Sequence, residues 1–390
     1  MSEYQYYEFR AIDRPLSLAE MAKLRAVSTR AEITASGFVN HYEWGDLKAD
    51  PSAWMRRYFD AFVYTANWAS CRLALRVPLA AFGLAEIKPF KDGECLSITA
   101  SDTHWIIDWQ QDGEDDERFE MDDGRGWMSR LAPLREELLC GDLRALYLGW
   151  LAGVAGAAFD EDADGDGDDA ALEPPVPPGL SALTAPQQAL VEFLQIDADM
   201  LAAAVAGSAP LSPVFDGDAG QLDAWLGEWS PGEMAAILKL IAQGQGFDAE
   251  RQVKARHAAW LKARRPPSDS QAQPRSVGAL RELAQQAQGV RLAHEAHERA
   301  LQKAEKRRQH EAHLRRLMAD VTPHWAAIEV HAQRGTAASY EKAASALAEL
   351  AQGYDLTASR EAFDHALRHW LVPHAKRGAL LRRLTGAGLL

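Results

Sequence analysis

The amino-acid sequence predicts an α+β N-terminal domain followed by mostly α-helical domains, one of which contains a single long helix. Residues 4–109 contain several short segments of aromatic-rich or alternating character, which is typical of strands. Residues 180–390 are instead rich in Ala, Leu, Glu, Gln and Arg, which favour helices. Within them, the 45 residues from Ser276 to Asp320 contain no proline. One uninterrupted helix is therefore expected there, and a helix of that length needs a packing partner.

The N-terminal part is expected to mix strands and helices that pack as layers on one sheet. The predicted strands are Tyr4–Ile12, Ile33–Trp44, Cys71–Pro78, Cys95–Ala100 and His104–Trp109. The predicted helices are Ser17–Val27, Pro51–Asn67 and two within Trp127–Phe159 that are separated near Gly141. Ser17 and Glu20 have the spacing of a capping box. The helix over Pro51–Asn67 is indicated by one apolar face, made of Trp54, Tyr58, Ala61 and Phe62.

Shifts in composition mark the predicted domain boundaries. Residues 159–180 carry 8 acidic and no basic side chains and are rich in Gly and Pro, so they cannot bury enough apolar surface to fold by themselves. The segment 266–275 is a second, shorter linker. The expected organisation is 1–159 as the α+β head, 160–179 as an acidic linker, 180–265 as a helical domain, 266–275 as a linker, and 276–390 as the long helix with a C-terminal helical bundle.

Each helical region has its own pattern of helix ends and apolar positions. The helices expected in the helical domain are Gln187–Gln195, Asp199–Ala206, Gln221–Trp229, Gly232–Gln243 and Asp248–Arg265. In the bundle, helix boundaries are expected at Thr322-Pro323, at Gly335-Thr336, at Gly353 with Thr357, and at Pro373. The predicted bundle core is Trp325, Ile328, Tyr340, Leu347, Leu350, Phe363, Leu367, Trp370 and Leu384.

Charge and cysteine content restrict the classes of function. The formal net charge is −14, but residues 266–390 carry 18 basic and 13 acidic side chains, so only the tail is suited to mild attraction of nucleic acid. The three cysteines stand far apart, which fits a reducing cytoplasm. No signal peptide is predicted at the N-terminus. The longest apolar run, Ala145–Phe159, is too short to predict a membrane span.

The C-terminal bundle resembles the helical region at the C-terminus of bacterial SWIM zinc-finger proteins. The matching residues are Trp325 with Ile328, Tyr340-Glu341-Lys342-Ala343, Leu347, Leu350, Phe363, His374-Ala375-Lys376-Arg377, Leu380-Leu381-Arg382-Arg383-Leu384 and Ala387-Gly388-Leu389. The C-x-C and C-x-H pairs of the zinc finger are absent from the sequence. The resemblance therefore implies a shared helical accessory region without zinc-dependent activity. The opening, from Tyr6 to Leu16, resembles an uncharacterised family of bacterial proteins.

Two patterns suggest metal binding, and for both the sequence favours another interpretation. The spacing of a calcium-binding loop is present in Asp162, Asp164, Asp166, Gly167, Asp168 and Glu173. Pro174 and Pro175 follow at once and block the exiting helix, so an acidic linker is the preferred interpretation. On the long helix, His294 with His297 and His310 with His313 have the i,i+3 spacing that a metal site in a bundle needs. Because no further ligand motif accompanies them, no metal site and no cofactor are predicted.

The predicted binding surface is an apolar stripe on the long helix. Leu280, Leu283, Ala287 and Val290 follow heptad spacing, and the same stripe continues through His294 and His297. The predicted partner-binding residues are Leu280, Leu283, Val290, His294 and His297. Because histidine gains charge below a pH of about 6.5, association through this stripe is expected to weaken in acid.

A basic cluster on the same helix offers a different surface. It consists of Lys303, Lys306, Arg307, Arg308, Arg315 and Arg316, which could contact phosphates. It is interleaved with glutamates and has no aromatic residue for base stacking, so a solvated helix face is the favoured interpretation. In the head, His41 with Glu43 and Asp102 with His104 are candidate acid–base pairs. No nucleophile motif or phosphate-binding loop accompanies them, and no catalytic residue is predicted.

Three functions remain open on the sequence alone. The preferred one is a cytoplasmic, non-enzymatic adaptor or scaffold that binds a protein partner through its helical tail, with a homo-oligomer also possible. The alternative is a nucleic-acid-associated accessory protein acting through the basic C-terminal helices. The third is an enzyme with an unrecognised site in the α+β head.

Overall fold

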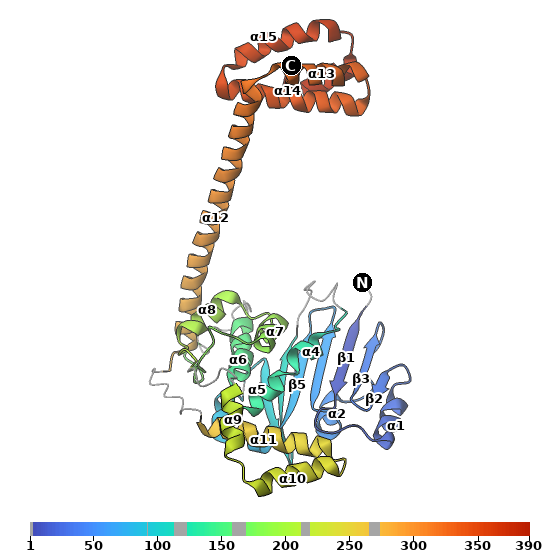
Figure 1. Cartoon of the computed structure of the whole chain (residues 1–390), viewed down its shortest axis with the longest axis vertical. Coiled ribbons are helices and arrows are strands. Elements are labelled where there is room, and N and C mark those ends of the chain that lie inside the picture. Colours follow the sequence, from blue (N-terminus) through green and yellow to red (C-terminus); the bar gives the residue numbers. More distant parts are fainter. Residues whose placement is uncertain (1–2, 92, 113–122, 158–168, 212–218, 265–273) are drawn as a thin grey trace. The chain divides into compact units, whose positions relative to one another are not determined.

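A computed structural model describes residues 3–91, 93–112, 123–157, 169–211, 219–264 and 274–390. The chain divides into two compact units, Met1–Gly289 and Val290–Leu390, and each is described by itself. The predicted fold class is confirmed, because an antiparallel sheet lies near the N-terminus and helices make up the rest (Figure 1). None of the helices in the described parts of the chain is both long and apolar enough to cross a membrane.

The first unit is built on one seven-stranded antiparallel sheet. Its strands lie in the order β2-β3-β1-β4-β5-β7-β6. Their bounds are β1 Gln5–Arg10, β2 Glu32–Thr34, β3 Gly37–Tyr42, β4 Ala61–Ala66, β5 Cys71–Pro78, β6 Leu96–Ala100 and β7 His104–Gln111. Aromatic residues of the central strands pair directly, as Phe9 does with Phe38 on one side and with Phe62 on the other.

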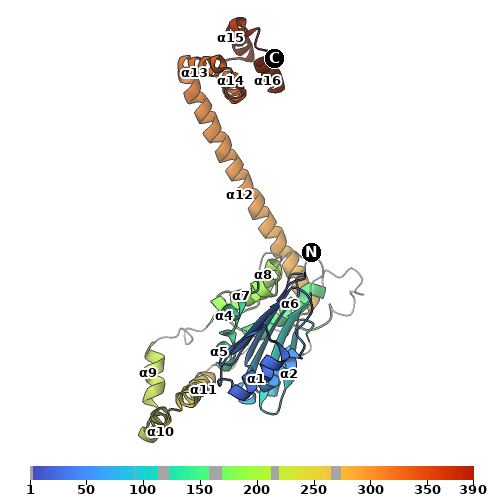
Figure 2. The same ribbon diagram turned by 90° about the vertical axis from the view of Figure 1, so that its right-hand side faces the viewer.

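Helices cover both faces of this sheet (Figure 2). On one face lie α1 Leu18–Val27 and α2 Pro51–Arg57, over an aromatic core that includes Phe9, Phe38 and Trp54. The larger core, on the other face, contains Leu73, Ile107 and Trp109 from the strands. The helices that contribute to it include α4 Trp127–Leu131, α5 Leu134–Leu139, α6 Arg144–Ala157, α7 Ala185–Phe193 and α8 Ala198–Ala206. Short helical segments α3 Leu84–Ile87, η1 Leu79–Ala81 and η2 Lys88–Phe90 connect β5 to β6.

Several predictions about the head are confirmed in detail. Strand β5 has the predicted bounds, and helix α1 begins after Ser17 with the capping box to Glu20. Gly141, with a φ of +79°, ends the short helix α5 and precedes α6. The two helices predicted between Trp127 and Phe159 are three, because α4 and α5 are separate turns.

Two further predictions about the head are wrong. The single strand predicted over Ile33–Trp44 is a hairpin of β2 and β3. The helix predicted over Pro51–Asn67 ends at Arg57, and β4 follows it. Most of β4 is buried on both faces, so it lacks the alternation of a half-buried strand, and its apolar run also fits a helix period.

Three further helices follow α8 in the first unit. They are α9 Ala219–Gly227, α10 Pro231–Ala242 and α11 Gly246–Arg264, close to their predicted bounds. Ser230 and Glu233 form a capping box at the start of α10. The first turns of the long helix, α12 Val277–Ala319, also belong to the first unit. The domain boundaries predicted within residues 1–289 stay a prediction.

The second unit is a small helical bundle. Its elements after α12 are α13 Thr322–Arg334, α14 Ala337–Thr357, α15 Arg360–Leu371, η5 Val372–His374 and α16 Gly378–Gly386. Every residue predicted for the bundle core is buried in it or packed against it. Gly335 and Thr336 separate two helices as predicted, with Gly335 at a φ of +70°.

Two expected boundaries in the bundle were wrong in detail. Gly353 lies inside α14, where a Cβ would come within 2.8 Å of the Met318 side chain, so this glycine permits close packing and does not end a helix. Thr322 is the first residue of α13 and not its cap, and the carboxylate of Asp320 accepts a hydrogen bond from the Thr322 N–H at 3.1 Å.

Candidate functional sites

The predicted partner-binding stripe is divided between two environments. Leu280 is fully buried in the larger core of the first unit, and Leu283 packs against that core. Val290 is 72 % exposed, and His294 and His297 are exposed as well. The start of the stripe therefore holds α12 to the first unit, and only its continuation from Val290 is accessible to another protein.

Most of the basic cluster on α12 is exposed to solvent. Arg307 is paired with Glu311 at 3.0 Å, and Arg308 is paired with Glu305 at 2.7 Å. Hydrogen bonds from Gln309 and then Arg308 lower the pKa of Glu305 below its ordinary value. Within this cluster, the exposed cations for which the described structure gives no ion pair are Lys303, Lys306, Arg315 and Arg316.

The histidine pairs of α12 are not brought together as a metal centre. His310 Nε2 lies 2.8 Å from Gln352 Oε1, and His313 Nε2 lies 2.7 Å from Glu349 Oε1. Both contacts tie α12 to α14 within the second unit. No group of three or more His, Cys, Asp or Glu side chains with metal-binding geometry is found among the described residues.

The calcium-loop pattern falls mainly on residues 162–168, which lie outside the described part of the chain. Its last residue, Glu173, is described, and its side chain is only 2 % exposed. Both carboxylate oxygens of Glu173 accept hydrogen bonds from Arg275, at 2.7 and 2.8 Å. The Tyr147 hydroxyl donates to the same carboxylate. Glu173 is thus used in a buried ion pair that joins residues 102 positions apart.

This ion pair belongs to a larger joint at the start of α12. The Glu173 N–H donates to the Arg275 carbonyl at 2.8 Å, and the Val277 N–H donates to the Ala171 carbonyl at 2.9 Å. Burial, and after it the charge of Glu173, raises the pKa of Tyr147. Residues 169–173, predicted as linker, therefore pair with residues 275–278, and Leu172 forms a β-bridge with Ser276. The sequence gives no signal for this pairing, since a lone Glu and a lone Arg far apart are ordinary surface residues.

The acid–base pairs proposed in the head are separated or exposed. His41 is exposed and stacks on the Tyr4 ring, with centroids 6.0 Å apart, whereas Glu43 lies beyond the end of β3. Asp102 is exposed in the turn between β6 and β7. His104, at the start of β7, is half-buried, and its Nδ1 lies 2.7 Å from Thr103 Oγ1.

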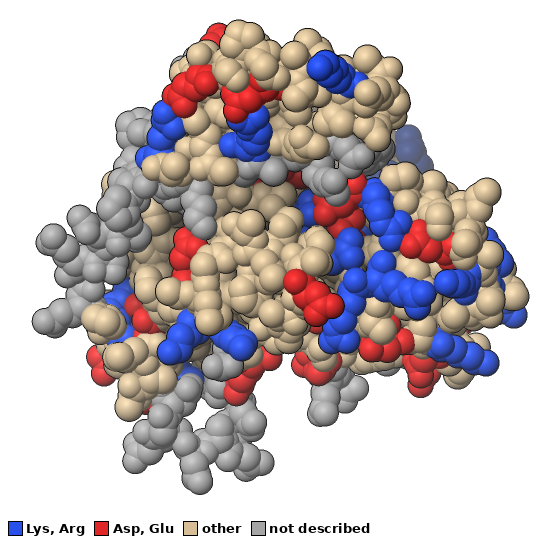
Figure 3. Space-filling model, turned by 90° about the horizontal axis from the view of Figure 1, so that it is seen from below, with Lys and Arg blue, Asp and Glu red and all other residues tan. Residues whose placement is uncertain are grey.

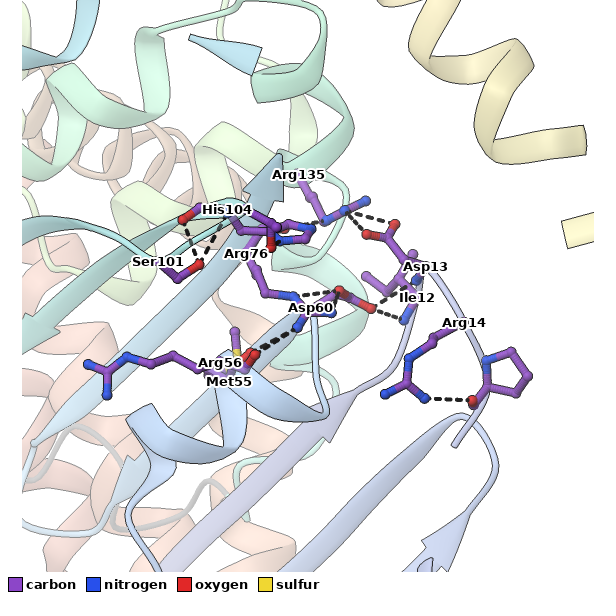
Figure 4. Close-up of polar contacts among 12 residues, drawn as sticks. Ile12, Asp13, Arg14, Met55, Arg56, Asp60, Arg76, Ser101, His104 and Arg135 are labelled. Atoms are coloured by element: carbon purple, nitrogen blue, oxygen red, sulfur yellow. Dashed lines mark hydrogen bonds and ion pairs between the residues drawn. The ribbon is translucent and has the colours of Figure 1, made fainter. Parts of the chain in front are cut away.

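His104 lies beside a polar network that the sequence did not predict (Figure 4). Its centre is Asp60, just before β4, which is almost completely buried. One carboxylate oxygen of Asp60 accepts the backbone N–H groups of Ile12 and Asp13, at 2.6 and 2.8 Å. The other accepts Arg76 Nε and Nη2, at 3.0 and 2.5 Å.

A second arginine extends the network to the helical layer. Arg135 of α5 donates from Nε to the Arg76 carbonyl at 2.7 Å and from Nη2 to both carboxylate oxygens of Asp13 at 2.8 Å. One buried and one partly buried carboxylate–guanidinium pair thus connect the end of β1, the start of β4, the end of β5 and helix α5. One end of the three central strands is therefore fixed in place by charge-assisted hydrogen bonds.

The chemistry of this network is that of a structural brace. Each carboxylate oxygen of Asp60 accepts two hydrogen bonds from other residues of the protein, so the carboxylate serves to connect these donors. Burial, and after it the nearby Arg76 guanidinium, lowers the pKa of His104. Figure 3 shows the end of the first unit that is lowest in Figure 1, where several basic side chains lie on the right-hand half with acidic side chains among them.

Comparisons with protein-family models, with curated proteins and with solved structures found no match to this chain.

Proposed function

We propose that this chain is a non-enzymatic adaptor or scaffold that binds a protein partner through its helical tail. The observation that supports this proposal most is the exposure of α12 between its two anchored ends. From residue 288 to residue 313 no side chain is buried. Val290, Leu292 and Leu301 are 72 %, 51 % and 56 % exposed.

Such a stretch is weakly stable when nothing covers it. Isolated helices are marginal in water, because most helix stability in proteins comes from packing of an apolar face. Arg291, Glu295 and Arg299 form i,i+4 ion pairs at 2.9 and 2.8 Å. Each exposed pair contributes only about 0.3–0.5 kcal/mol. A facing helix that covers Val290 and Leu301 would add far more, and heptad spacing is the pattern that such a helix recognises.

The test compares two substitutions on opposite sides of the same helical turn. Val290→Asp places a charge on the stripe, and Leu292→Asp makes a comparable change about 200° away around the helix. Both variants are made in the full chain, and their masses in solution are measured beside the wild type. If the partner is a second copy, Val290→Asp dissociates the oligomer and Leu292→Asp leaves it intact.

If the wild type is monomeric, the same three proteins are used to capture a partner, which is then purified and titrated. We expect binding to wild type and to Leu292→Asp, with at least a tenfold loss for Val290→Asp, since an unpaired charge is buried at the contact. Equal binding by both variants would refute the stripe as the contact surface.

The alternative, nucleic-acid binding, is favoured by the exposed Lys303, Lys306, Arg315 and Arg316. It predicts that binding of the full chain to DNA or RNA falls steeply as salt rises. Lys303→Glu/Lys306→Glu would then abolish binding, whereas Val290→Asp would not. The third possibility, an enzyme that uses the head, predicts an activity lost in His104→Ala.

A further inference from the structure

The sheet face that is covered by α1 and α2 carries a pocket that the proposed function does not use. The pocket has a volume of about 160 Å³, enough for about five water molecules. It lies beside the start of α2, on the face of the sheet that carries the aromatic core. Its lining consists of Tyr7, Pro51, Phe62, Tyr64, Cys71, Arg72, Gln110 and Asp112.

Three aromatic rings give the pocket its wall. Tyr7 and Tyr64 lie with ring centroids 4.8 Å apart, and Phe62 stacks on Tyr7 at 6.4 Å. Both tyrosine hydroxyls donate to Gln5 Oε1, at 2.7 and 3.0 Å. Burial, and after it the charge of Asp46, raises the pKa of Tyr7 to about 12. The rings are therefore neutral at physiological pH, and they are held rigidly by one buried amide.

Among the described residues of the lining the one cation is Arg72, and its charge is neutralised within the protein. Arg72 donates from Nε to both oxygens of Asp108, at 2.9 and 3.1 Å, and from Nη2 to Asp108 Oδ2 at 2.5 Å. Arg72 Nη2 also donates to Ser52 Oγ at 2.8 Å. This pairing places the guanidinium carbon 5.7 Å from the Phe62 ring centroid, so Arg72 already makes a cation–π contact at this wall.

Counted over the described residues, further carboxylates give the pocket surplus negative charge. Asp50 and Asp112 interact electrostatically with Arg72, and Asp46 and Asp112 do so with Tyr64. Asp46, Asp50 and Asp112 accept hydrogen bonds from neutral groups, which are the Gln5 amide, the Ser52 N–H and the Gln110 amide. Within the described residues, Lys48 makes no ion pair with Asp46 or Asp50.

We propose that this pocket binds a small organic cation, an alkylammonium ion free in solution. Aromatic faces attract cations, more strongly when both are partly removed from water. Surplus carboxylate charge adds attraction for a cation and disfavours an anion. A metal ion would instead require several oxygen ligands directed at one point, which the aromatic wall does not supply.

The test uses choline and its uncharged isostere 3,3-dimethylbutan-1-ol, each titrated into the full chain by calorimetry and by ligand-observed NMR. We expect choline to bind and the isostere to bind at least tenfold more weakly, with choline binding weakened by added salt. Equal binding of the two, or no binding of choline at millimolar concentration, would overturn the proposal.

Two variants locate the site on the protein. Asp112→Asn removes a charge at the exposed rim, and Tyr64→Leu removes an aromatic face; each should weaken choline binding about fivefold. Asp102→Asn, at the other end of β7, is the matched control and should bind choline as the wild type does. If Asp112→Asn binds as tightly as this control, the cation does not bind in this pocket.

A lysine side chain from a partner protein has the same charged group. Nα-acetyl-lysine amide is therefore titrated beside choline. Tighter binding of the lysine compound, lost in Asp112→Asn, would overturn the assignment to a free small molecule.

Discussion

Breaking the buried Asp60–Arg76 pair on one side should destabilise the protein more than removing both charges together. Asp60→Ala leaves Arg76 buried without its counter-ion and removes the acceptor of two backbone N–H groups. Breaking a buried ion pair on one side costs about 3–5 kcal/mol. Domains are stable by only about 5–15 kcal/mol, so this variant should be close to unfolding.

The double variant Asp60→Ala/Arg76→Leu tests whether the effects of the two substitutions on stability are coupled. It removes both charges and places an apolar side chain in the space of the arginine, so it should be more stable than Asp60→Ala. The exposed pair between Arg130 and Glu192 supplies the control, because removing an exposed charge costs about 0–1 kcal/mol. Glu192→Ala should therefore leave the stability nearly unchanged.

The measurement is urea unfolding of the full chain, combined with hydrogen exchange at the amides of Ile12 and Asp13. Those two amides donate to Asp60 and should lose protection in Asp60→Ala before the rest of the sheet does. A cost below about 1 kcal/mol for Asp60→Ala would refute the brace. The single variant Arg76→Leu is measured in the same way, and destabilisation of the double variant by the sum of the two single effects would refute the coupling.

Further predictions concern other parts of the head. The lowered pKa of His104 means that, at a pH near about 6.5, the folded state binds fewer protons than the unfolded state. The free energy of unfolding should therefore fall as pH falls through this range. In His104→Asn the urea midpoint of unfolding should change less with pH than in the wild type. Gly124→Ala should lower the melting temperature more than Gly126→Ala. Both glycines have positive φ, but only at Gly124 would a Cβ lie 2.6 Å from the Tyr6 side chain, so a larger effect at Gly126 would contradict this reasoning. Calcium should not raise the melting temperature, because the Glu173 carboxylate is paired with arginine; a rise that Glu173→Ala abolishes would show a calcium site.

Elements whose signals are local could be predicted from the sequence. The capping box at Ser17 and Glu20, the bounds of β5 and the length of α12 depend on neighbouring residues or on propensity summed over many positions. The bundle core was equally visible, since apolar residues at helix spacing indicate which face is buried.

Features that depend on distant residues were decided only by the tertiary structure. Strand β4 lies between β1 and β5, and pairing on both sides, together with burial, overrides the helical spacing of Ala61 and Phe62. The predicted stripe on α12 has one heptad pattern, yet Leu280 is in a core and Val290 is exposed.

The charged residues show most clearly what could not be predicted from the sequence. The role of each charged residue depends on the side chains that folding places around it. This holds for Asp60 with Arg76, for Glu173 with Arg275 and for the aspartates around the pocket. A carboxylate is held strongly only when folding removes it from water beside a cation, and that partner lies 16 positions away for Asp60 and 102 for Glu173. The sequence by itself determined which segments form helices and strands where the signals are local, while the tertiary structure determined which charges are buried, paired and left exposed.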